Sequence, residues 1–315
     1  MRRFALLLLP VLMAGSLTAC GGASSGSTAS SDVKVSGSYG SKPKVTVTKG
    51  AKAAKKLEVD VLEQGDGPKV AKGDLLVADY LGQVYKSGKV FDNSYDRKVP
   101  ASFPIGVGGV IPGWDKALVG VESGSRVLMV VPPKDGYGKT GNPQAGIKGT
   151  DSLIFVVDVI ASYGKSGETL KTTAATDIPT DLPTVTGEPG AEPTITVPAG
   201  TTPPKSPKVT VLAKGTGPAV AKSKLAVVEY TAVNWTGKAL SSSWQKDEKG
   251  VRQGPQGVPI GGAQPSPFDL LVGIPAGSRV LLTLPAQTGS DATKESVAVV
   301  IDVLGVHGPA KGDGK

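Results

Sequence analysis

The chain has 315 residues, a formal net charge of +8 and 5% aromatic residues, and it contains 43 glycines and 25 prolines. This length is enough for two domains of ordinary size, each burying a core without help from disulfides. So much glycine and proline favours strands, turns and linkers and argues against a helical bundle. We therefore expect a β-rich protein.

Residues 1–19, MRRFALLLLPVLMAGSLTA, combine two arginines with an apolar run too short to span a bilayer as a permanent helix. This pattern is typical of an export signal. The run closes on Leu17, Thr18, Ala19 and Cys20, which resembles the lipobox of bacterial lipoproteins. Cys20 is the only cysteine, and lipidation would protect an exported thiol from mispairing. We expect lipidation at Cys20, and the alternative is a plain signal peptide with a chance cysteine.

Residues 20–34 are small and polar, which predicts a flexible tether between the lipid anchor and the folded chain. Seven lysines lie between residues 34 and 56. They could favour anionic headgroups, but a solvated lysine-rich segment is the simpler interpretation. Without interleaved aromatics or a nucleic-acid motif, we expect no binding to DNA or RNA.

Comparison of the chain with itself reveals a duplication, because residues 59–80 match residues 209–230 at a shift of 150. The register returns at LVGVESGSRVLMVVP against LVGIPAGSRVLLTLP, and at SLIFVVDVI against SVAVVIDVL. After the signal and tether, the predicted organisation is a first domain (35–164), a linker (165–184), a second, related domain (185–307) and a tail (308–315).

In chain order, the first copy has strand-like patterns over residues 58–67, 74–85, 125–132 and 152–160. Its one helix is predicted over 113–120, between the second and third strands, with Trp114 on its apolar face. We therefore predict an α+β fold of two domains, each a curved antiparallel sheet wrapped around one short α-helix. Trp114 must then point into the concave side of its sheet.

The residue inventory excludes much of enzyme chemistry. The only histidine, His307, is expected in the tail after the last strand, and Cys20 is committed to lipid. Imidazole or thiol catalysis and His/Cys metal sites are therefore excluded, and we expect no metal and no cofactor. No phosphate-binding loop is present, since the glycine-rich stretch 105–114 opens no long helix after a strand.

Rotation about an X-Pro amide needs none of these groups, because it breaks no bond that stays broken. The twisted amide is less polar than the planar one. A dry apolar pocket that grips the proline ring therefore favours the twisted form.

Residues 57–162 resemble the FKBP-type peptidyl-prolyl cis-trans isomerases. The resemblance is carried, in the family's order and spacing, by GKVFDNSYDR, by the VI-x-GW segment, by PKDGYG and by the closing LIF strand. It implies a proline pocket lined by Tyr80, Phe91, Val110, Ile111, Trp114, Tyr137 and Phe155.

The resemblance also implies individual roles. Trp114 forms the pocket floor, and the backbone N–H of Ile111 and the hydroxyl of Tyr137 hold substrate carbonyls. Asp92, braced by Tyr80 and Arg97, forms a polar rim with Arg97. Ile147 is a further expected substrate contact. Taken alone, Val110, Ile111 and Phe155 are equally compatible with core positions, and Asp92 with the end of a strand.

Three positions of the first copy depart from the family. Ala101 stands where an aromatic wall is usual, Asn142 where a loop histidine is common, and Gly109 where an acidic residue is frequent. One residue is added between Pro143 and Ile147. We expect these changes to alter peptide preference and affinity for the family's macrolide ligands more than the core activity.

The second copy keeps Tyr230 but has Leu240 and Ser241 for Phe91 and Asp92, Pro267 beside Phe268 at the tryptophan position, and Val299 for Phe155. Its segment between Pro285 and Ser296 lacks the tyrosine loop. We expect a folded domain without a working site. The alternative is a distinct site around Trp235, Trp244 and residues 246–264, for which a solvated loop is the simpler interpretation.

These observations predict a lipid-anchored isomerase that assists the folding of exported proteins at the outer face of the cytoplasmic membrane. Its expected partners are proline-containing exported polypeptides, the membrane and macrolide ligands. A non-catalytic chaperone or binding lipoprotein built from two such modules is the first alternative. A structural or adhesion protein of the cell envelope is the second.

Overall fold

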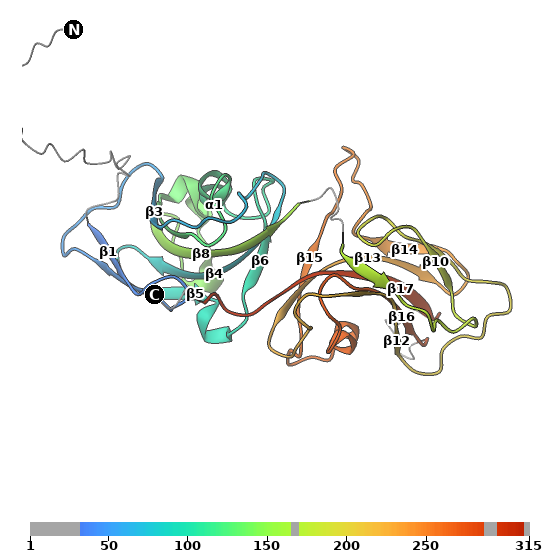
Figure 1. The fold of residues 1–315 in the computed structure, drawn as a ribbon. Helices are drawn as coiled ribbons and strands as arrows, with labels where there is room; N and C mark the ends of the chain where they lie inside the picture. Colours follow the sequence, from blue (N-terminus) through green and yellow to red (C-terminus); the bar gives the residue numbers. More distant parts are fainter. Residues whose placement is uncertain (1–31, 165–169, 287–294, 312–315) are drawn as a thin grey trace, which may run out of the picture.

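The computed structural model describes residues 32–164, 170–286 and 295–311, and these form two units that lie side by side (Figure 1). We call residues 33–163 the first unit and residues 172–307 the second unit. The predicted signal and lipidation site, Cys20 included, lie outside the described residues. None of the helices in the described ranges is long and apolar enough to cross a membrane.

The main sheet of the first unit is antiparallel throughout. Its strands, in spatial order, are β3 (Glu58–Glu63), β7 (Arg126–Val131), β8 (Leu153–Tyr163), β4 (Leu75–Val84) and β5 (Val90–Asn93), with β6 (Ala101–Pro104) also pairing with β4. The four predicted strands are present, and the structure adds β5 and β6. The predicted helix is α1 (Pro112–Leu118), which starts with a proline where a missing N–H costs nothing.

The concave side of this sheet holds the core. Strand β4 is buried along its whole length, and its inward residues Leu76, Ala78 and Tyr80 pack with Trp114 and Leu118 of α1. The period-2 alternation of a strand puts Leu75, Val77 and Asp79 on the opposite, convex side. The expected α+β architecture, a curved antiparallel sheet around one short helix, is confirmed for this unit.

The convex side carries a hairpin that the sequence did not reveal. Strands β1 (Val33–Ser36) and β2 (Lys44–Val47) pair antiparallel and lay alternate valines on Leu128, Val130, Ile154 and Val156. The predicted tether 20–34 is therefore too long by at least its last two residues, which belong to β1. Alternation over only four residues, set in a polar context, is too short to identify such a strand.

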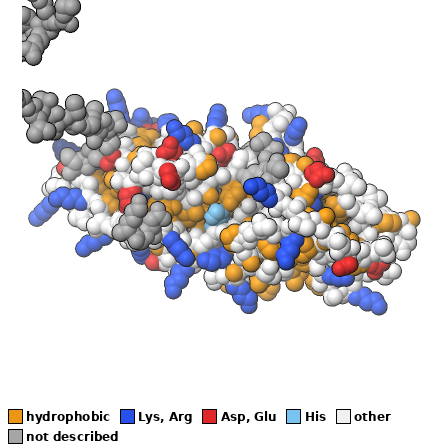
Figure 2. All heavy atoms as spheres, in the orientation of Figure 1, with side chains coloured by type: hydrophobic (Ala, Val, Ile, Leu, Met, Phe, Trp, Pro, Cys, Tyr) orange, Lys and Arg blue, Asp and Glu red, His pale blue; other side chains and the backbone are white. Residues whose placement is uncertain are grey.

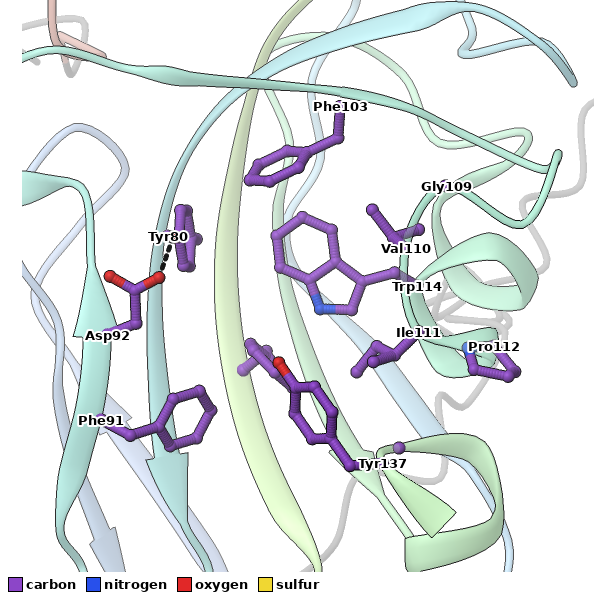
Figure 3. A pocket seen from close by; sticks show the side chains of 12 residues that line it. Tyr80, Phe91, Asp92, Phe103, Gly109, Val110, Ile111, Pro112, Trp114 and Tyr137 are labelled. Atoms are coloured by element: carbon purple, nitrogen blue, oxygen red, sulfur yellow. Dashed lines mark hydrogen bonds between the residues drawn. The ribbon is translucent and has the colours of Figure 1, made fainter. Parts of the chain in front are cut away.

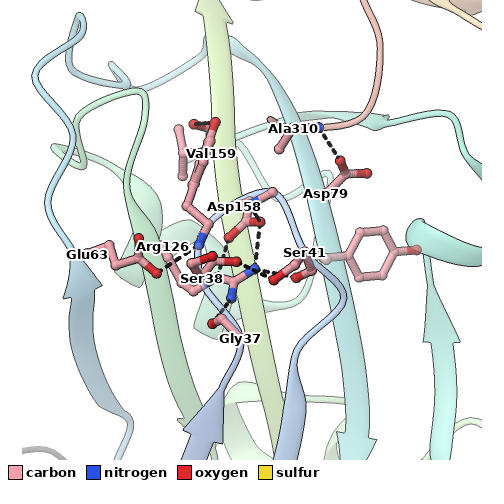
Figure 4. Close-up of polar contacts among 12 residues, drawn as sticks. Gly37, Ser38, Ser41, Glu63, Asp79, Arg126, Asp158, Val159 and Ala310 are labelled. Atoms are coloured by element: carbon pink, nitrogen blue, oxygen red, sulfur yellow. Dashed lines mark hydrogen bonds and ion pairs between the residues drawn. The ribbon is translucent and has the colours of Figure 1, made fainter. Parts of the chain in front are cut away.

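A buried arginine ties the hairpin to the sheet (Figure 4). Arg126 pairs with Asp158 through Nε and Oδ1 at 2.6 Å, and both side chains are almost fully buried. The guanidinium also donates to the carbonyls of Gly37 and Ser41 in the hairpin loop, and the N–H of Gly40 donates to Asp158. The hairpin is thus held by charge-assisted hydrogen bonds to its backbone as well as by apolar packing.

The second unit repeats this plan. Its sheet runs β14 (Ala239–Ser242), β13 (Leu225–Asn234), β17 (Val297–His307), β16 (Arg279–Leu284), β12 (Lys208–Gly215) and β9 (Thr172–Ala174), with β15 (Gln256–Pro259) also on β13. The hairpin β10 (Thr184–Thr186) and β11 (Thr194–Thr196) is pinned by Arg279 and Asp302, as the first hairpin is by Arg126 and Asp158.

Three sequence-based predictions for this part of the chain need correction. The predicted linker 165–184 contains β9, because Thr172–Ala174 pair antiparallel with strand β12 at the edge of the sheet. His307 is the last residue of β17 and does not lie in the tail after the last strand. The second unit has a 3-10 helix, Pro267–Leu271, where an α-helix was expected, because only five residues separate the Ser266 capping box from Val272.

Four further 3-10 helices lie in the first unit, at Tyr95–Arg97, Pro133–Asp135, Gly138–Thr140 and Pro143–Ala145. The first of these contains Arg97, and the second directly precedes Gly136 and Tyr137, all of which belong to the site described below.

The two units meet through the convex sides of β4 and β13. Leu75, Val77 and Tyr163 pack against Leu225, Val227 and Leu304 in one buried cluster. The hydroxyl of Tyr163 lies 2.6 Å from Nε2 of His307. Gly305 permits this approach, since a Cβ there would lie 1.8 Å from the tyrosine oxygen. Lys and Arg side chains are spread around the outline of both units and form no single stripe on the face shown in Figure 2.

Candidate active site

A cavity of about 530 Å³ opens on the concave side of the first unit, between α1 and the sheet (Figure 3). Twelve residues line it: Tyr80, Phe91, Asp92, Phe103, Gly109, Val110, Ile111, Pro112, Trp114, Gly136, Tyr137 and Phe155. They come from β4, β5, β6, β8, α1 with the loop before it, and the loop after the 3-10 helix Pro133–Asp135. Elements far apart in the sequence thus converge on one hollow.

The walls of the cavity are aromatic rings set edge to face. The Trp114 ring centroid lies 5.5 Å from Tyr80, 5.0 Å from Phe103 and 5.4 Å from Phe155, with interplanar angles of 72° to 88°. Phe91 meets Phe155 in the same way at 5.7 Å. Rings that brace one another edge to face hold fixed positions. The indole, although 4% exposed, therefore presents a rigid surface to the cavity.

Gly82 on β4 makes room for this arrangement. A Cβ at this position would come within 2.6 Å of the Phe91 ring and 3.0 Å of Phe155. The missing side chain lets both rings lie against the strand. The counterpart in the second unit is Ala232, which faces Val299 as Gly82 faces Phe155.

Tyr80, Asp92 and Arg97 form a hydrogen-bonded rim. The Tyr80 hydroxyl donates to Oδ2 of Asp92, and Arg97 donates to Oδ1 of Asp92 at 2.7 Å and to the Tyr80 oxygen at 3.1 Å. Burial, together with the hydrogen bond to Asp92, raises the pKa of Tyr80 to about 12. Partial burial works to raise the pKa of Asp92, but hydrogen bonds from Tyr80 and Arg97 outweigh it and lower that pKa. Asp92 is thus ionised and Tyr80 protonated at neutral pH.

Three N–H or O–H donors at the cavity have no hydrogen-bond acceptor within the described parts of the chain. They are the backbone N–H of Ile111, the hydroxyl of Tyr137 and the buried indole N–H of Trp114. A ligand that offers carbonyl oxygens to these donors gains hydrogen bonds that the described parts of the protein do not make themselves.

The loops that carry two of these donors are held by acidic residues. Asp115 of α1 accepts from the N–H groups of Gly106 and Gly108, both at 2.7 Å, and so fixes the loop before Ile111. Lys116 pairs with the buried Asp135, two residues before Tyr137. Gly113 allows α1 to approach β7, because a Cβ there would lie 2.8 Å from Val131.

The structure brings most of the predicted site residues together. Tyr80, Phe91, Asp92, Val110, Ile111, Trp114, Tyr137 and Phe155 all line the cavity, whereas their roles toward a substrate stay predictions. Arg97 lies on the rim, half-exposed, and bonds to Asp92. Ile147, 3% exposed, is packed in the core and does not line the cavity. Asn142 caps the 3-10 helix Pro143–Ala145 with its side chain.

Four further residues line the cavity that were not predicted to do so: Phe103, Gly109, Pro112 and Gly136. Phe103 supplies the aromatic wall that Ala101 was expected to leave open. The signal was present, because residues two apart on a strand share a face, so Phe103 points the same way as Ala101.

The second unit lacks the matching side chains. Strand register places Ser241 where Asp92 lies. Asp269 accepts from Gly261 as Asp115 accepts from Gly106, so by this contact Phe268, and not Pro267, takes the place of Trp114. Phe268 packs into the core of the second unit.

Comparisons with known proteins agree with this geometry. The family model described as FKBP-type peptidyl-prolyl cis-trans isomerase matches residues 67–160. The chain is 35% identical over 120 residues to an FK506-binding protein of Streptomyces anulatus, covering 38% of this chain and 96% of that protein. The chain belongs to the FKBP-type peptidyl-prolyl cis-trans isomerases, a family of enzymes.

Two further matches are a longer relative, matched in part, and a solved structure that is matched over almost its full length. The isomerase FkpA of Escherichia coli K12 is 39% identical over 104 residues, which cover 33% of this chain and 37% of FkpA. The crystal structure of AtFKBP13 is 34% identical, covers 35% of this chain and 96% of its own, and has a TM-score of 0.32. No group of three or more His, Cys, Asp or Glu side chains suited to a metal ion occurs within residues 32–164, 170–286 and 295–311.

Proposed function

We propose that the first unit catalyses cis-trans isomerisation of X-Pro bonds in polypeptides. The observation that carries this proposal is the cavity with aromatic walls and three donors that have no acceptor within the described parts of the chain. A proline ring fits the apolar surface of Trp114, Tyr80 and Phe155, and the adjacent carbonyls reach Ile111 N–H and the Tyr137 hydroxyl.

The mechanism needs no proton transfer. The planar amide has a rotation barrier of about 20 kcal/mol from resonance, and resonance is lost in the twisted form. Water stabilises the planar, more polar amide, so a site that replaces water with aromatic rings favours the twisted form by comparison. Each 1.4 kcal/mol of such preference gives about tenfold in rate. The donors fix the flanking carbonyls while the amide turns.

The test is a proline-peptide isomerisation assay on the full chain. Trp114→Ala combined with Tyr137→Phe should lower kcat/KM by about tenfold or more, since packing and one hydrogen bond are both lost. Tyr230→Phe in the second unit is the matched control and should leave the rate unchanged. An unchanged rate in the double variant would refute the proposed pocket.

A macrolide ligand of the family would enter the same cavity and compete with the peptide. Gly109 and Ala101 offer it less side-chain surface than the acidic and aromatic residues usual there. Competition should therefore be measurable as inhibition of the peptide assay, and absence of inhibition would restrict the cavity to peptides.

We also propose that the protein is lipid-anchored and acts on exported polypeptides at the outer face of the cytoplasmic membrane. The support is the sequence of residues 1–34, with its apolar run and single cysteine. Cys20→Ser should move the protein from the membrane fraction to the aqueous fraction. Retention in the membrane would count against lipidation.

The second candidate is a non-catalytic chaperone that binds unfolded polypeptides. The second unit favours it, since this unit has a folded core but lacks the aromatic side chains of the pocket. The two candidates separate with a proline-free client protein. Suppression of its aggregation by a protein with no isomerase activity would support the chaperone function alone.

A further inference from the structure

The contact between the units joins equivalent positions of the two repeats. Leu75 and Val77 on β4 correspond to Leu225 and Val227 on β13, and all four lie in the same buried cluster. Tyr163 and His307, which share a hydrogen bond, are the last residues of the equivalent strands β8 and β17. A surface that meets its own counterpart is the hallmark of a two-fold dimer, here within one chain.

One contact breaks this symmetry. After β17 the chain leaves the second unit and runs back over the first (Figure 1). There the backbone N–H of Ala310 donates to Oδ2 of Asp79 at 2.7 Å (Figure 4). Ala310 is 6% exposed and Asp79 is fully buried. The C-terminal segment therefore contributes a donor to the interior of the other unit.

Asp79 is connected to the pocket residue Tyr80 by hydrogen bonds through Ser94. Its Oδ1 accepts from the hydroxyl of Ser94 at 2.6 Å, and that hydroxyl oxygen accepts from the N–H of Tyr80 at 2.9 Å. The N–H of Ser94 donates in turn to the carbonyl of Tyr80 at 3.0 Å. Ser94 is fully buried and follows β5, so this chain of bonds fixes Tyr80 to the segment that carries Asp92 and Arg97.

The second unit treats the equivalent acid differently. Glu229 occupies the position of Asp79, and Ser243 bonds to Tyr230 N–H as Ser94 does to Tyr80. Glu229 pairs with Arg252, whose guanidinium stacks on Trp244 at 3.4 Å. That cation comes from the second unit's own inserted segment. Within the described residues Asp79 has no such arginine partner among its hydrogen bonds, and its Oδ2 accepts from the N–H of Ala310 in the C-terminal segment instead.

We propose that Asp79 is a positioning residue of the isomerase site. The C-terminal segment that follows the second unit completes this site, because the N–H of Ala310 donates a hydrogen bond to Oδ2 of Asp79. The proposal rests on the proposed isomerase function. A buried carboxylate oxygen that loses its donor must rearrange or recruit water. Here the adjacent groups are Ser94 and Tyr80, so the rearrangement would reach the pocket rim.

The test uses the full chain with Ala310→Pro, which removes the donor N–H, and Ala310→Gly, which keeps it. Ala310→Pro should lower kcat/KM at least about threefold relative to Ala310→Gly, with the same unfolding midpoint for the second unit. In NMR spectra it should shift the backbone amide signals of Tyr80 and Ser94, which a change confined to the tail would not move.

A double-mutant cycle with Asp79→Ala makes the assignment specific. Once the acceptor is gone, Ala310→Pro should have no further effect on rate or spectra. The proposal is overturned if the Pro and Gly variants have the same rate and the same Tyr80 and Ser94 signals, or if the proline acts equally in the Asp79→Ala background. An inactive wild type would refute the isomerase function itself, and the amide signals would still decide whether the tail reaches the rim.

Discussion

The hydroxyl of Tyr163 and Nε2 of His307 lie 2.6 Å apart, and they join the ends of equivalent strands in the two units. The rings also meet edge to face at 5.7 Å. Burial lowers the pKa of His307, so the neutral ring is the form that fits the contact. The junction between the units is therefore sensitive to protonation at a single known residue.

Stability should fall as the pH drops below about 6.5. The pKa of His307 is about 6.5 when unfolded and lower when folded, so the unfolded chain binds more protons in the window between the two values. The contribution of His307 to the free energy of unfolding is complete above pH 6.5. It is lost as the pH falls toward the folded pKa, by up to about 1.4 kcal/mol per pH unit. Urea unfolding at pH 7.5 and 5.5 measures the loss.

His307→Gln should remove this dependence, because it is the only histidine in the chain. Tyr163→Phe keeps the titrating ring and serves as the control. If the pH dependence between 7.5 and 5.5 survives in His307→Gln, another group is responsible.

Isomerase activity should be flat between pH 7 and 9. Asp92 has a lowered pKa, Tyr80 a pKa of about 12 and Arg97 a raised one, since Asp92 and Tyr80 bond to it against the effect of burial. None of the three changes charge in this window. An exchange assay without a coupling protease should show less than about a twofold change in kcat/KM. A bell-shaped profile within the window would indicate acid-base catalysis.

Gly82→Ala should impair the pocket. The added methyl would meet the Phe91 ring at 2.6 Å, and overpacking of this kind costs about 1 to 3 kcal/mol. We expect kcat/KM to fall about tenfold or more as Phe91 and Phe155 are displaced. Ala232→Gly in the second unit is the matched control for activity.

Combining Gly82→Ala with Phe155→Val copies the pair Ala232 and Val299 that the second unit already accommodates. This double variant should recover part of the lost stability, since the contact with Phe155 is relieved and that with Phe91 remains, without recovering activity. Recovered activity would show that Phe155 is dispensable for the reaction.

Arg126→Leu should destabilise the first unit by about 3 to 5 kcal/mol, because it leaves Asp158 buried without its partner. It also deprives the Gly37 and Ser41 carbonyls of their donor. Unfolding can be followed by Trp114 fluorescence in a Trp235→Phe/Trp244→Phe background. Arg279→Leu removes the equivalent pair of the second unit, and an identical response of Trp114 to both changes would mean that the units unfold together.

The sequence predicted the parts of the fold that have long periodic patterns. Strand β4 and α1 were recognisable because ten and seven residues carry a clear apolar face. The hairpin β1–β2 was not, because four-residue strands with two valines each resemble any polar segment. Its anchor, Arg126, lies 89 residues from Gly37, and such pairing has no local signal.

Most of the residues that line the cavity were predicted from the resemblance to the family, and the others were not. Eight lining residues follow from the resemblance, whereas Phe103 does not, because the family's usual aromatic wall position holds Ala101 in this chain. Ile147 was misplaced into the cavity, since an apolar residue in a loop gives no sign of which way it packs. The bond from Ala310 to Asp79 spans 231 residues and could be found only in the structure.

The burial of Ala310 has a practical consequence. A purification tag or fusion partner inserted directly after residue 311 would begin one residue beyond the hydrogen bond from Ala310 to Asp79 of the first unit. Its bulk would strain that contact. Preparations intended for kinetics are better tagged ahead of residue 32, where the chain enters β1 and no described contact of the pocket is near.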